Sequence, residues 1–183
     1  MESVNVKDLM VPIAEYATVS EEATLFDAVM ALEKAQEKLD KAGYKYLHRA
    51  VIVLDDKGNV VGKISQLDAL RALEPKYGDM GDLGRTGFSP QFLKSMMERF
   101  SLLDKPLEAI CSKAAKIKVK SFMYTPGEGE YITEEDSLGS AVHLLVMGNH
   151  QSLLVMKGDK ISGVLRLTDV FMYVFDKMKT CEI

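Results

Sequence analysis

Apolar residues in the chain follow two spacings, and each spacing predicts one kind of element. Short apolar runs at 50–54 ("AVIVL") and 60–65 ("VVGKIS") are separated by the charged turn "DDKGN", which is typical of a β-hairpin. A second pair of runs, at 152–156 and 161–166, surrounds the turn "KGDK". Apolar residues at helical spacing after Leu25 and Leu138 predict a helix before each hairpin. Further helices are predicted after the hairpins, at about 67–73 and 167–178.

The order of elements occurs twice because the sequence itself repeats. "ATVSEEATLFDAV" aligns with "EYITEEDSLGSAV" at an offset of 113 (133 − 20), and each contains a short strand and a predicted helix N-cap, Ser20 or Thr133. The hairpin segments align at an offset of 101 (169 − 68), which places Gly62 on Gly163 and Asp68 on Asp169. The same offset pairs "KDLM" (7–10) with "EAIC" (108–111), which we take as the start of each repeat.

The pattern predicts an α/β (α+β) protein with two tandem β-α-β-β-α repeats that pack on each other by pseudo-twofold symmetry. A single unit of this size would leave one sheet face uncovered, so packing of the two halves is expected. We assign 1–74 to repeat 1, 75–106 to a connector and 107–183 to repeat 2. The connector is rich in glycine and then enters a helix at Ser89 and Pro90, which suit the N-cap and first helical positions.

Composition excludes several classes of protein. The net charge of −4 disfavours a nucleic-acid binder, and no apolar run approaches the roughly 20 residues of a membrane span. The N-terminus lacks the pattern of a signal peptide. The two cysteines do not form a disulfide framework, which favours a reducing compartment and a cytoplasmic protein.

The duplicated unit, ending each time in Gly followed six residues later by Asp at a helix start, resembles a tandem pair of cystathionine beta-synthase (CBS) domains, the Bateman module. This resemblance covers about 4–74 and 107–178. It implies two clefts between the repeats that take adenosine-containing ligands such as AMP, ADP, ATP or S-adenosylmethionine. It also implies a flat homodimer. We further expect a regulatory module that acts through another, unknown effector protein and catalyses no reaction of its own.

Asp68 and Asp169 match the ribose-binding aspartate of that family, and a carboxylate at a strand-to-helix junction can accept bonds from both ribose hydroxyls. Ser65 and Asp68 also form a capping box that needs no ligand. Ser65 matches the family's hydroxyl residue, whereas Arg166 replaces it in repeat 2. Arg166 could bind phosphate or pair with a carboxylate, and the second alternative would put the second ligand in doubt.

The resemblance also implies a phosphate contact by "HR" before the hairpin, His48 and Arg49, with His150 in the place of Arg49 in repeat 2. The alternative is a pair of surface cations at strand starts. For adenine, the family uses the first strand and the hairpin. These map to six positions here: Thr18, Val19 and Ala50 for one cleft, and Tyr131, Ile132 and Gln151 for the other. Tyr131 could stack on a base or pack at a strand edge.

No motif for a catalytic or metal site is present. The chain has no Walker A loop and no nucleophile elbow, and neither its histidines nor its cysteines have metal-ligand spacing. Two other hypotheses remain: a protein-interaction adaptor with empty clefts, and an enzyme that uses the glycine-rich connector as a lid. The apolar stripe of the last helix, from Val170 to Met178, favours a homodimer.

Overall fold

A computed structural model describes residues 4–42, 47–74, 76, 88–100 and 108–180. Its strands are β1 (Val11–Pro12), β2 (Thr18–Ser20), β3 (Ala50–Leu54), β4 (Val60–Ser65), β5 (Tyr131–Thr133), β6 (Ser152–Lys157) and β7 (Lys160–Arg166). Its α-helices are α1 (Leu25–Ala42), α2 (Gln66–Leu73), α4 (Pro90–Phe100), α5 (Glu108–Ala114), α6 (Leu138–Met147) and α7 (Leu167–Lys179). Both predicted hairpins are confirmed.

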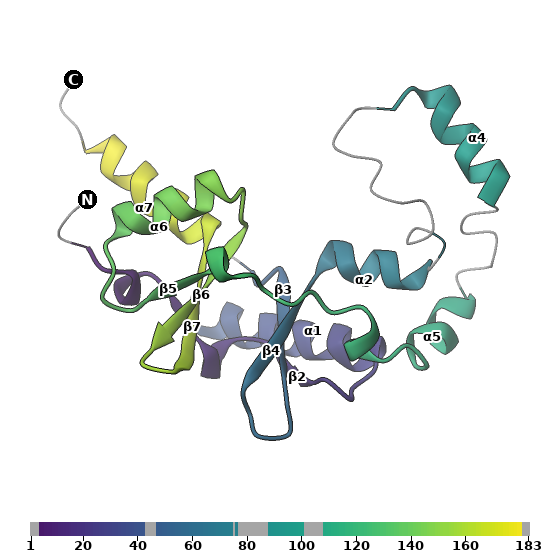
Figure 1. Cartoon of the computed structure of the whole chain (residues 1–183), viewed down its shortest axis with the longest axis horizontal. Coiled ribbons are helices and arrows are strands. Elements are labelled where there is room, and N and C mark those ends of the chain that lie inside the picture. The colour runs from purple at the N-terminus through teal and green to yellow at the C-terminus, as the bar shows by residue number, and fades with distance from the viewer. Residues whose placement is uncertain (1–3, 43–46, 75, 77–87, 101–107, 181–183) are drawn as a thin grey trace.

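Two small sheets lie side by side at the centre of the molecule, with helices around them (Figure 1). The first has the order β2-β3-β4 and the second the order β1-β7-β6-β5. In each sheet the first strand of the repeat runs parallel to the next strand, and that strand forms an antiparallel hairpin. The parallel pairs need a crossover, which α1 and α6 provide. The predicted fold class is therefore confirmed.

The helix caps differ from those predicted. Ser137 caps α6, with its hydroxyl accepting from the N–H of Ser140 at 3.1 Å, and Thr24 accepts from the N–H of Asp27 at the start of α1. Ser20 and Thr133 lie several residues earlier and stabilise the turn after each strand instead. The prediction that these two residues are N-caps is wrong, because a turn separates each strand from its helix.

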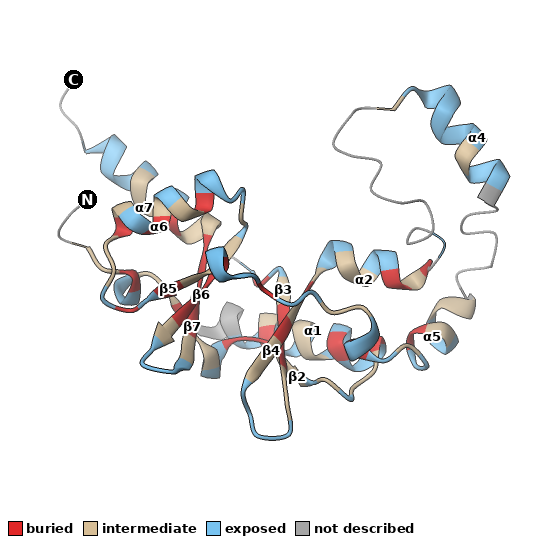
Figure 2. Cartoon of the chain, in the orientation of Figure 1, coloured by how far each residue is buried: buried red, intermediate tan, exposed pale blue. Residues whose placement is uncertain are grey.

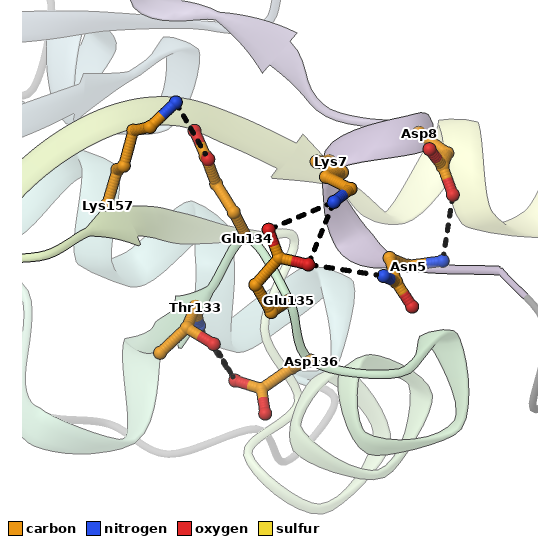
Figure 3. A network of polar contacts seen from close by, with 8 residues as sticks. All are labelled: Asn5, Lys7, Asp8, Thr133, Glu134, Glu135, Asp136 and Lys157. Atoms are coloured by element: carbon orange, nitrogen blue, oxygen red, sulfur yellow. Dashed lines mark hydrogen bonds and ion pairs between the residues drawn. The ribbon is translucent and has the colours of Figure 1, made fainter.

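Each repeat is completed by a leading segment from the other repeat. Leading segment 1 (residues 4–12) packs on repeat 2, where the N–H of Leu138 donates to the carbonyl of Val4 at 2.9 Å. Leading segment 2 (residues 117–124) packs on repeat 1, where the N–H of Leu25 donates to the carbonyl of Ile117 at 2.8 Å. Figure 3 shows the polar side of the first contact, where the ammonium of Lys7 bonds to both carboxylate oxygens of Glu135.

The exchanged segments correct the sequence alignment. The bonds made by Val6 and Lys7 in repeat 2 are reproduced by Val119 and Lys120 in repeat 1, so "VKDLM" (6–10) corresponds to "VKSFM" (119–123) at an offset of 113 (119 − 6). The proposed pairing of "KDLM" with "EAIC" is therefore wrong. The "EAIC" residues belong to α5, which packs on repeat 1 through Ala114, beside Leu25 and Ala72.

A glycine lies at each point where a leading segment crosses a hairpin. A Cβ on Gly163 would lie 2.7 Å from the carbonyl oxygen of Val11, and a Cβ on Gly62 would lie 3.1 Å from that of Tyr124. Backbone cannot move aside as a flexible side chain can, so a Cβ at Gly163 would clash with the crossing segment, and a Cβ at Gly62 would make an unusually tight contact with it. The Gly62–Gly163 equivalence predicted from sequence is thereby given its physical reason.

The core has one cluster in each repeat, a third between the sheets, and a smaller fourth formed by Leu25, Ala72 and Ala114. Buried residues lie along the central strands (Figure 2). Val6 and Val119, from the leading segments, are 0% exposed and belong to the cores of the opposite repeats. The cluster between the sheets consists of Val11, Tyr16, Ile52, Leu154 and Val164. The two repeats therefore share a continuous apolar interface.

The connector is described only in part, since 75, 77–87 and 101–107 lie outside the described residues. Its helix is confirmed: α4 begins at Pro90, and the N–H of Phe92 donates to the Ser89 hydroxyl at 3.2 Å. Its apolar residues Phe92, Leu93 and Met97 are between 41% and 52% exposed, so they do not enter the core of the single chain.

Candidate functional site

Asp68 lies in the first turn of α2, and this helix begins directly after Ser65, the last residue of β4. Its Oδ2 accepts from both the N–H of Ser65, at 2.9 Å, and the Ser65 hydroxyl, at 2.6 Å. The Ser65 hydroxyl in turn accepts from the N–H of Asp68 at 3.1 Å. The predicted capping box is present, and it uses one carboxylate oxygen. Among the described residues, none donates to Oδ1 of Asp68, so half of this carboxylate is available to a ligand.

Asp169 occupies the equivalent place at the start of α7 but has different partners. Arg166 donates from Nε to Oδ2 at 2.5 Å and from Nη2 to Oδ1 at 2.7 Å, so both carboxylate oxygens are engaged. Arg166 is 7% exposed, and a bidentate pair of this kind holds the guanidinium plane in one orientation. Of the two roles considered for Arg166, the structure shows carboxylate pairing.

The guanidinium of Arg166 continues into a buried aromatic group. Its Nη1 donates to Nδ1 of His48 at 3.3 Å, and the His48 ring lies on Tyr16 with centroids 4.0 Å apart. His48 is 0% exposed, so it is not a cation on the surface. In this conformation a phosphate group in solvent does not reach its ring. Arg49, its neighbour, is exposed.

The partners of His48 define its protonation. Arg166 is a donor at every nitrogen, so Nδ1 of His48 accepts and Nε2–H donates to the carbonyl of Glu15 at 3.0 Å. Burial lowers the pKa of His48, and the Arg166 charge acts in the same direction. Burial also raises the pKa of Tyr16 to about 12. Both rings are therefore neutral near pH 7, and Arg166 and Asp169 carry the charges of this group.

Strand register corrects the equivalence of the basic residues. Thr18 pairs with Ile52 and Tyr131 with Leu154, so β3 aligns with β6 at an offset of 102 (154 − 52). His150 therefore takes the place of His48, not that of Arg49, and Gln151 takes the place of Arg49. The offset changes to 101 only after the hairpin turn, because the turn of repeat 2 is one residue shorter. The sequence alignment used one offset on both sides of the turn, so it did not pair His48 with His150.

The contacts of His150 differ from those of His48. An added Cβ on Gly129 would lie 3.9 Å from Nε2 of His150, and Gly129 stands at the position of Tyr16 (129 − 16 = 113). His150 is partly exposed, whereas His48 is fully buried. We call Ser65, Asp68, Gly129 and His150 the Asp68 half of the molecule, and the equivalent Arg166, Asp169, Tyr16 and His48 the Asp169 half.

A buried polar group beside the Asp68 half was not predicted. Glu130 is 2% exposed and pairs with Lys63 of β4, while its Oε1 accepts from the Tyr124 hydroxyl at 2.6 Å. Burial alone would raise the pKa of Glu130, but the bonds from Lys63 and Tyr124 outweigh burial and lower it. The charge of Asp68 contributes to the raised pKa of Tyr124, which places this group near the candidate site. Aligning "VKDLMV" with "VKSFMY" places Tyr124 at the position of Val11, and this is the signal in the sequence that could have identified it.

The remaining predicted residues divide into packed and accessible positions. The side chains of Val19 and Ile132 pack into the cores of their own repeats. Thr18 and Tyr131 are partly buried, and Tyr131 packs against the cluster between the sheets. Two further positions lie beside the helix starts: Ala50 pairs with Ser65, and the carbonyl of Gln151 accepts from the N–H of Leu167 at 3.0 Å.

Within the described part of the chain, no three His, Cys, Asp or Glu side chains are grouped so that they could hold a metal ion. None of the described helices is both long and apolar enough to cross a membrane.

Comparison with known proteins gives this arrangement its family. The model of the CBS domain matches the chain twice, over residues 6–75 and 119–176. The chain therefore belongs to the CBS domain family, with two repeats that form a tandem Bateman module. No curated protein matches the chain.

Several solved structures share the fold at low identity. CBSX2 from Arabidopsis thaliana is 18% identical with a TM-score of 0.60, over 97% of this chain and 98% of that one. Its complex with AMP matches with a TM-score of 0.54. A CBS domain-containing protein from Bacillus anthracis is 19% identical, with a TM-score of 0.61 and 96% of both chains covered. The CBS domain of a bacterial CNNM/CorC family Mg²⁺ transporter, in complex with ATP, is 17% identical with a TM-score of 0.59, over 95% and 89%.

Proposed function

We propose that the chain is a non-enzymatic regulatory module that binds an adenine nucleotide or S-adenosylmethionine where a hairpin meets the helix that follows it. Family membership supports the regulatory class, and the AMP and ATP complexes of related folds support the ligand class. The observation that carries the proposal to this chain is the Asp68 carboxylate. It is held rigid through Oδ2 by Ser65, and it leaves Oδ1 to accept from a ribose hydroxyl.

Exposed apolar side chains on the helices support an output through protein contact. Phe171, Phe175 and Met178 of α7 are between 41% and 65% exposed, and Leu67 and Leu70 of α2 are 56% and 63% exposed. Such faces are typical of interaction surfaces. In the proposed function they form a homodimer and present the module to an effector protein in the cytoplasm, where the exposed thiol of Cys111 stays reduced.

Thermal unfolding with AMP, ADP, ATP and S-adenosylmethionine, each over a concentration series, tests the proposal. A compound that binds the folded chain and not the unfolded chain raises the midpoint temperature as its concentration rises. At one hundred times Kd, it raises the free energy of unfolding by about 2.7 kcal/mol. We expect such a rise with at least one compound, and its loss in Asp68→Ala. No rise with any compound would favour the adaptor, which has no ligand. Turnover of ATP or AMP on incubation would instead support the enzyme hypothesis.

A further inference from the structure

The two halves of the molecule differ at the positions that decide whether a ligand has room. Arg166 in the Asp169 half corresponds to Ser65 in the Asp68 half, and Tyr16 corresponds to Gly129. Each large side chain of one half is thus replaced by one of the smallest in the other. Arg166 and Tyr16 are 7% and 6% exposed, so they fill protein interior and do not extend into solvent.

The charges of the two halves differ in the same sense. In the Asp169 half, both oxygens of the carboxylate accept from Arg166. A ribose hydroxyl there would compete with a charge-assisted bidentate pair, and separating the buried guanidinium from the Asp169 carboxylate would cost several kcal/mol. In the Asp68 half, Ser65 occupies Oδ2 and contributes no charge. A ligand on that side meets a carboxylate whose negative charge is not neutralised by a neighbour three residues away.

His48 and Tyr16 hold the side chain of Arg166 in place in the Asp169 half. His48 accepts from Arg166 and donates to the Glu15 carbonyl, so the guanidinium cannot turn away without breaking a chain of bonds. Its counterpart His150 has no arginine at the equivalent position, since Ser65 stands there, and it is partly exposed. The arginine of repeat 2 is therefore held in place, whereas the residue at its position in repeat 1 is Ser65, whose hydroxyl bonds to Asp68.

We propose that the chain binds one nucleotide, at the Asp68 half, because Arg166 occupies the ligand position of the Asp169 half. This inference rests on the proposed function and adds a stoichiometry and a location to it. In this arrangement Arg166 is an internal substitute for a ligand: it supplies to Asp169 the two hydrogen bonds that ribose hydroxyls would supply. The Asp169 half then holds the repeats together in one arrangement, and we call it the fixed half. The contact between the repeats in the Asp68 half can change when a ligand binds, and we call it the variable half.

The variable half also has polar side chains between the repeats. Lys63, Tyr124 and Glu130 correspond to Val164, Val11 and Ala17 of the fixed half, which are 1%, 2% and 2% exposed. At these three positions the fixed half therefore has apolar contacts, beside its buried hydrogen bond from Arg166 to His48. In the Asp68 half, the contact between repeats depends on hydrogen bonds with specific geometry, which a ligand can rearrange more readily than an apolar core.

Isothermal titration of the full chain with AMP and with ATP tests the inference. For the wild type we expect one site per chain. Asp68→Asn should weaken binding by at least about tenfold, because it removes the charge from an accepting oxygen. Asp169→Asn, the matched control, should leave affinity and stoichiometry unchanged. Arg166→Ser copies Ser65 into the fixed half and should raise the stoichiometry to two. Circular dichroism of each variant shows whether it is folded.

The outcomes separate the two proposals. Two sites per wild-type chain, or binding that Asp169→Asn abolishes and Asp68→Asn does not, would overturn the single-site inference and leave the nucleotide sensor standing. A stoichiometry of one in folded Arg166→Ser would show that Arg166 does not exclude the second ligand. Should Arg166→Ser not fold, the comparison of the two asparagine variants still decides the location. No binding of AMP, ADP, ATP or S-adenosylmethionine to the wild type would overturn both proposals.

Discussion

The Asp68 half and the Asp169 half follow the same course of strand, helix start and crossing segment, yet their side chains are of opposite kinds. Where the first has Ser65 and Gly129, the second has Arg166 and Tyr16. Where the first has the buried pair Lys63–Glu130, the second has Val164 and Ala17. The backbone bonds of the exchanged segments are repeated within 0.1 Å, as in 2.9 Å for Val6 to Asp136 and 2.9 Å for Val119 to Ala23.

This difference separates two requirements on a duplicated fold. The exchange of leading segments joins the repeats, and the backbone bonds that form it are the same on both sides. The positions beside the aspartates are free of that requirement, and there one copy has the small residues Ser65 and Gly129 and the other has the large residues Arg166 and Tyr16. The predictions below test whether the two halves differ in stability and chemistry as their side chains indicate.

The largest effect is expected at the buried pair of the Asp68 half. Glu130→Ala would leave the Lys63 ammonium, whose side chain is 16% exposed, without its partner, and breaking a buried ion pair costs about 3–5 kcal/mol. Chemical denaturation measures this loss as a lower midpoint. The double variant Lys63→Val/Glu130→Ala, which copies the residues of the other half, should recover most of the stability. A double variant as unstable as the single one would contradict the account.

The two aspartates should contribute differently to stability. Asp169→Ala removes the carboxylate that pairs with the buried guanidinium of Arg166, so we expect a loss of about 3 kcal/mol. Asp68→Ala removes part of a capping box, which is worth about 1 kcal/mol. Denaturation of both variants without ligand gives the comparison. Equal losses would mean that the Arg166–Asp169 pair is not the structural joint that we infer.

Much of the fold could be predicted from the sequence because its signals are local. The alternating runs at β3 and β4 and the Ser65–Asp68 capping box appear within a few residues of each other, and all three are confirmed. The exchange of leading segments could not be obtained in this way, since it joins Val6 to a helix start about 130 residues later. Periodicity contains no information about which distant edge a short segment will cover.

The sequence was enough to predict which residues belong to the candidate site, but not which of them are buried. The sequence indicates Arg166 three residues before Asp169, a spacing at which side chains meet on a helix, so their pairing was within reach. The burial of His48 was not, because it depends on Tyr16 and Arg166 meeting from opposite repeats. The equivalence of His48 with His150 was missed because the hairpin turns differ by one residue.

A smaller effect is expected from pH, and it belongs to the Asp169 half. Burial lowers the pKa of His48 in the folded chain, so between that value and the unfolded value of about 6.5 the unfolded chain binds more protons. The stability that this residue contributes is present above about pH 6.5 and is lost as the pH falls below it. Denaturation between pH 5 and 8 measures the slope.

Protonated His48 would face the Arg166 guanidinium and Tyr16, with Asp169 and the Glu15 carbonyl partly compensating. In His48→Gln, which does not titrate, the decline in stability below about pH 6.5 should be shallower. His150→Gln is the matched control from the other half, and we expect the decline to persist in that variant. An unchanged slope in His48→Gln would show that acid sensitivity arises elsewhere.

The smallest effects are expected where the halves are alike. Lys7 pairs with Glu135 and Lys120 with Glu22, each joining a leading segment to the opposite repeat with the ammonium 2.8 Å or 2.7 Å from the carboxylate. Both pairs are solvent-exposed, so water and salt screen them. Lys7→Met and Lys120→Met should each lower the thermal midpoint slightly at low salt, by similar amounts, and the decrease should vanish near 1 M salt. A large or salt-independent loss in one variant alone would show that the exchanged segments are not energetically equivalent, and would extend the asymmetry of the two halves into the contacts that join them.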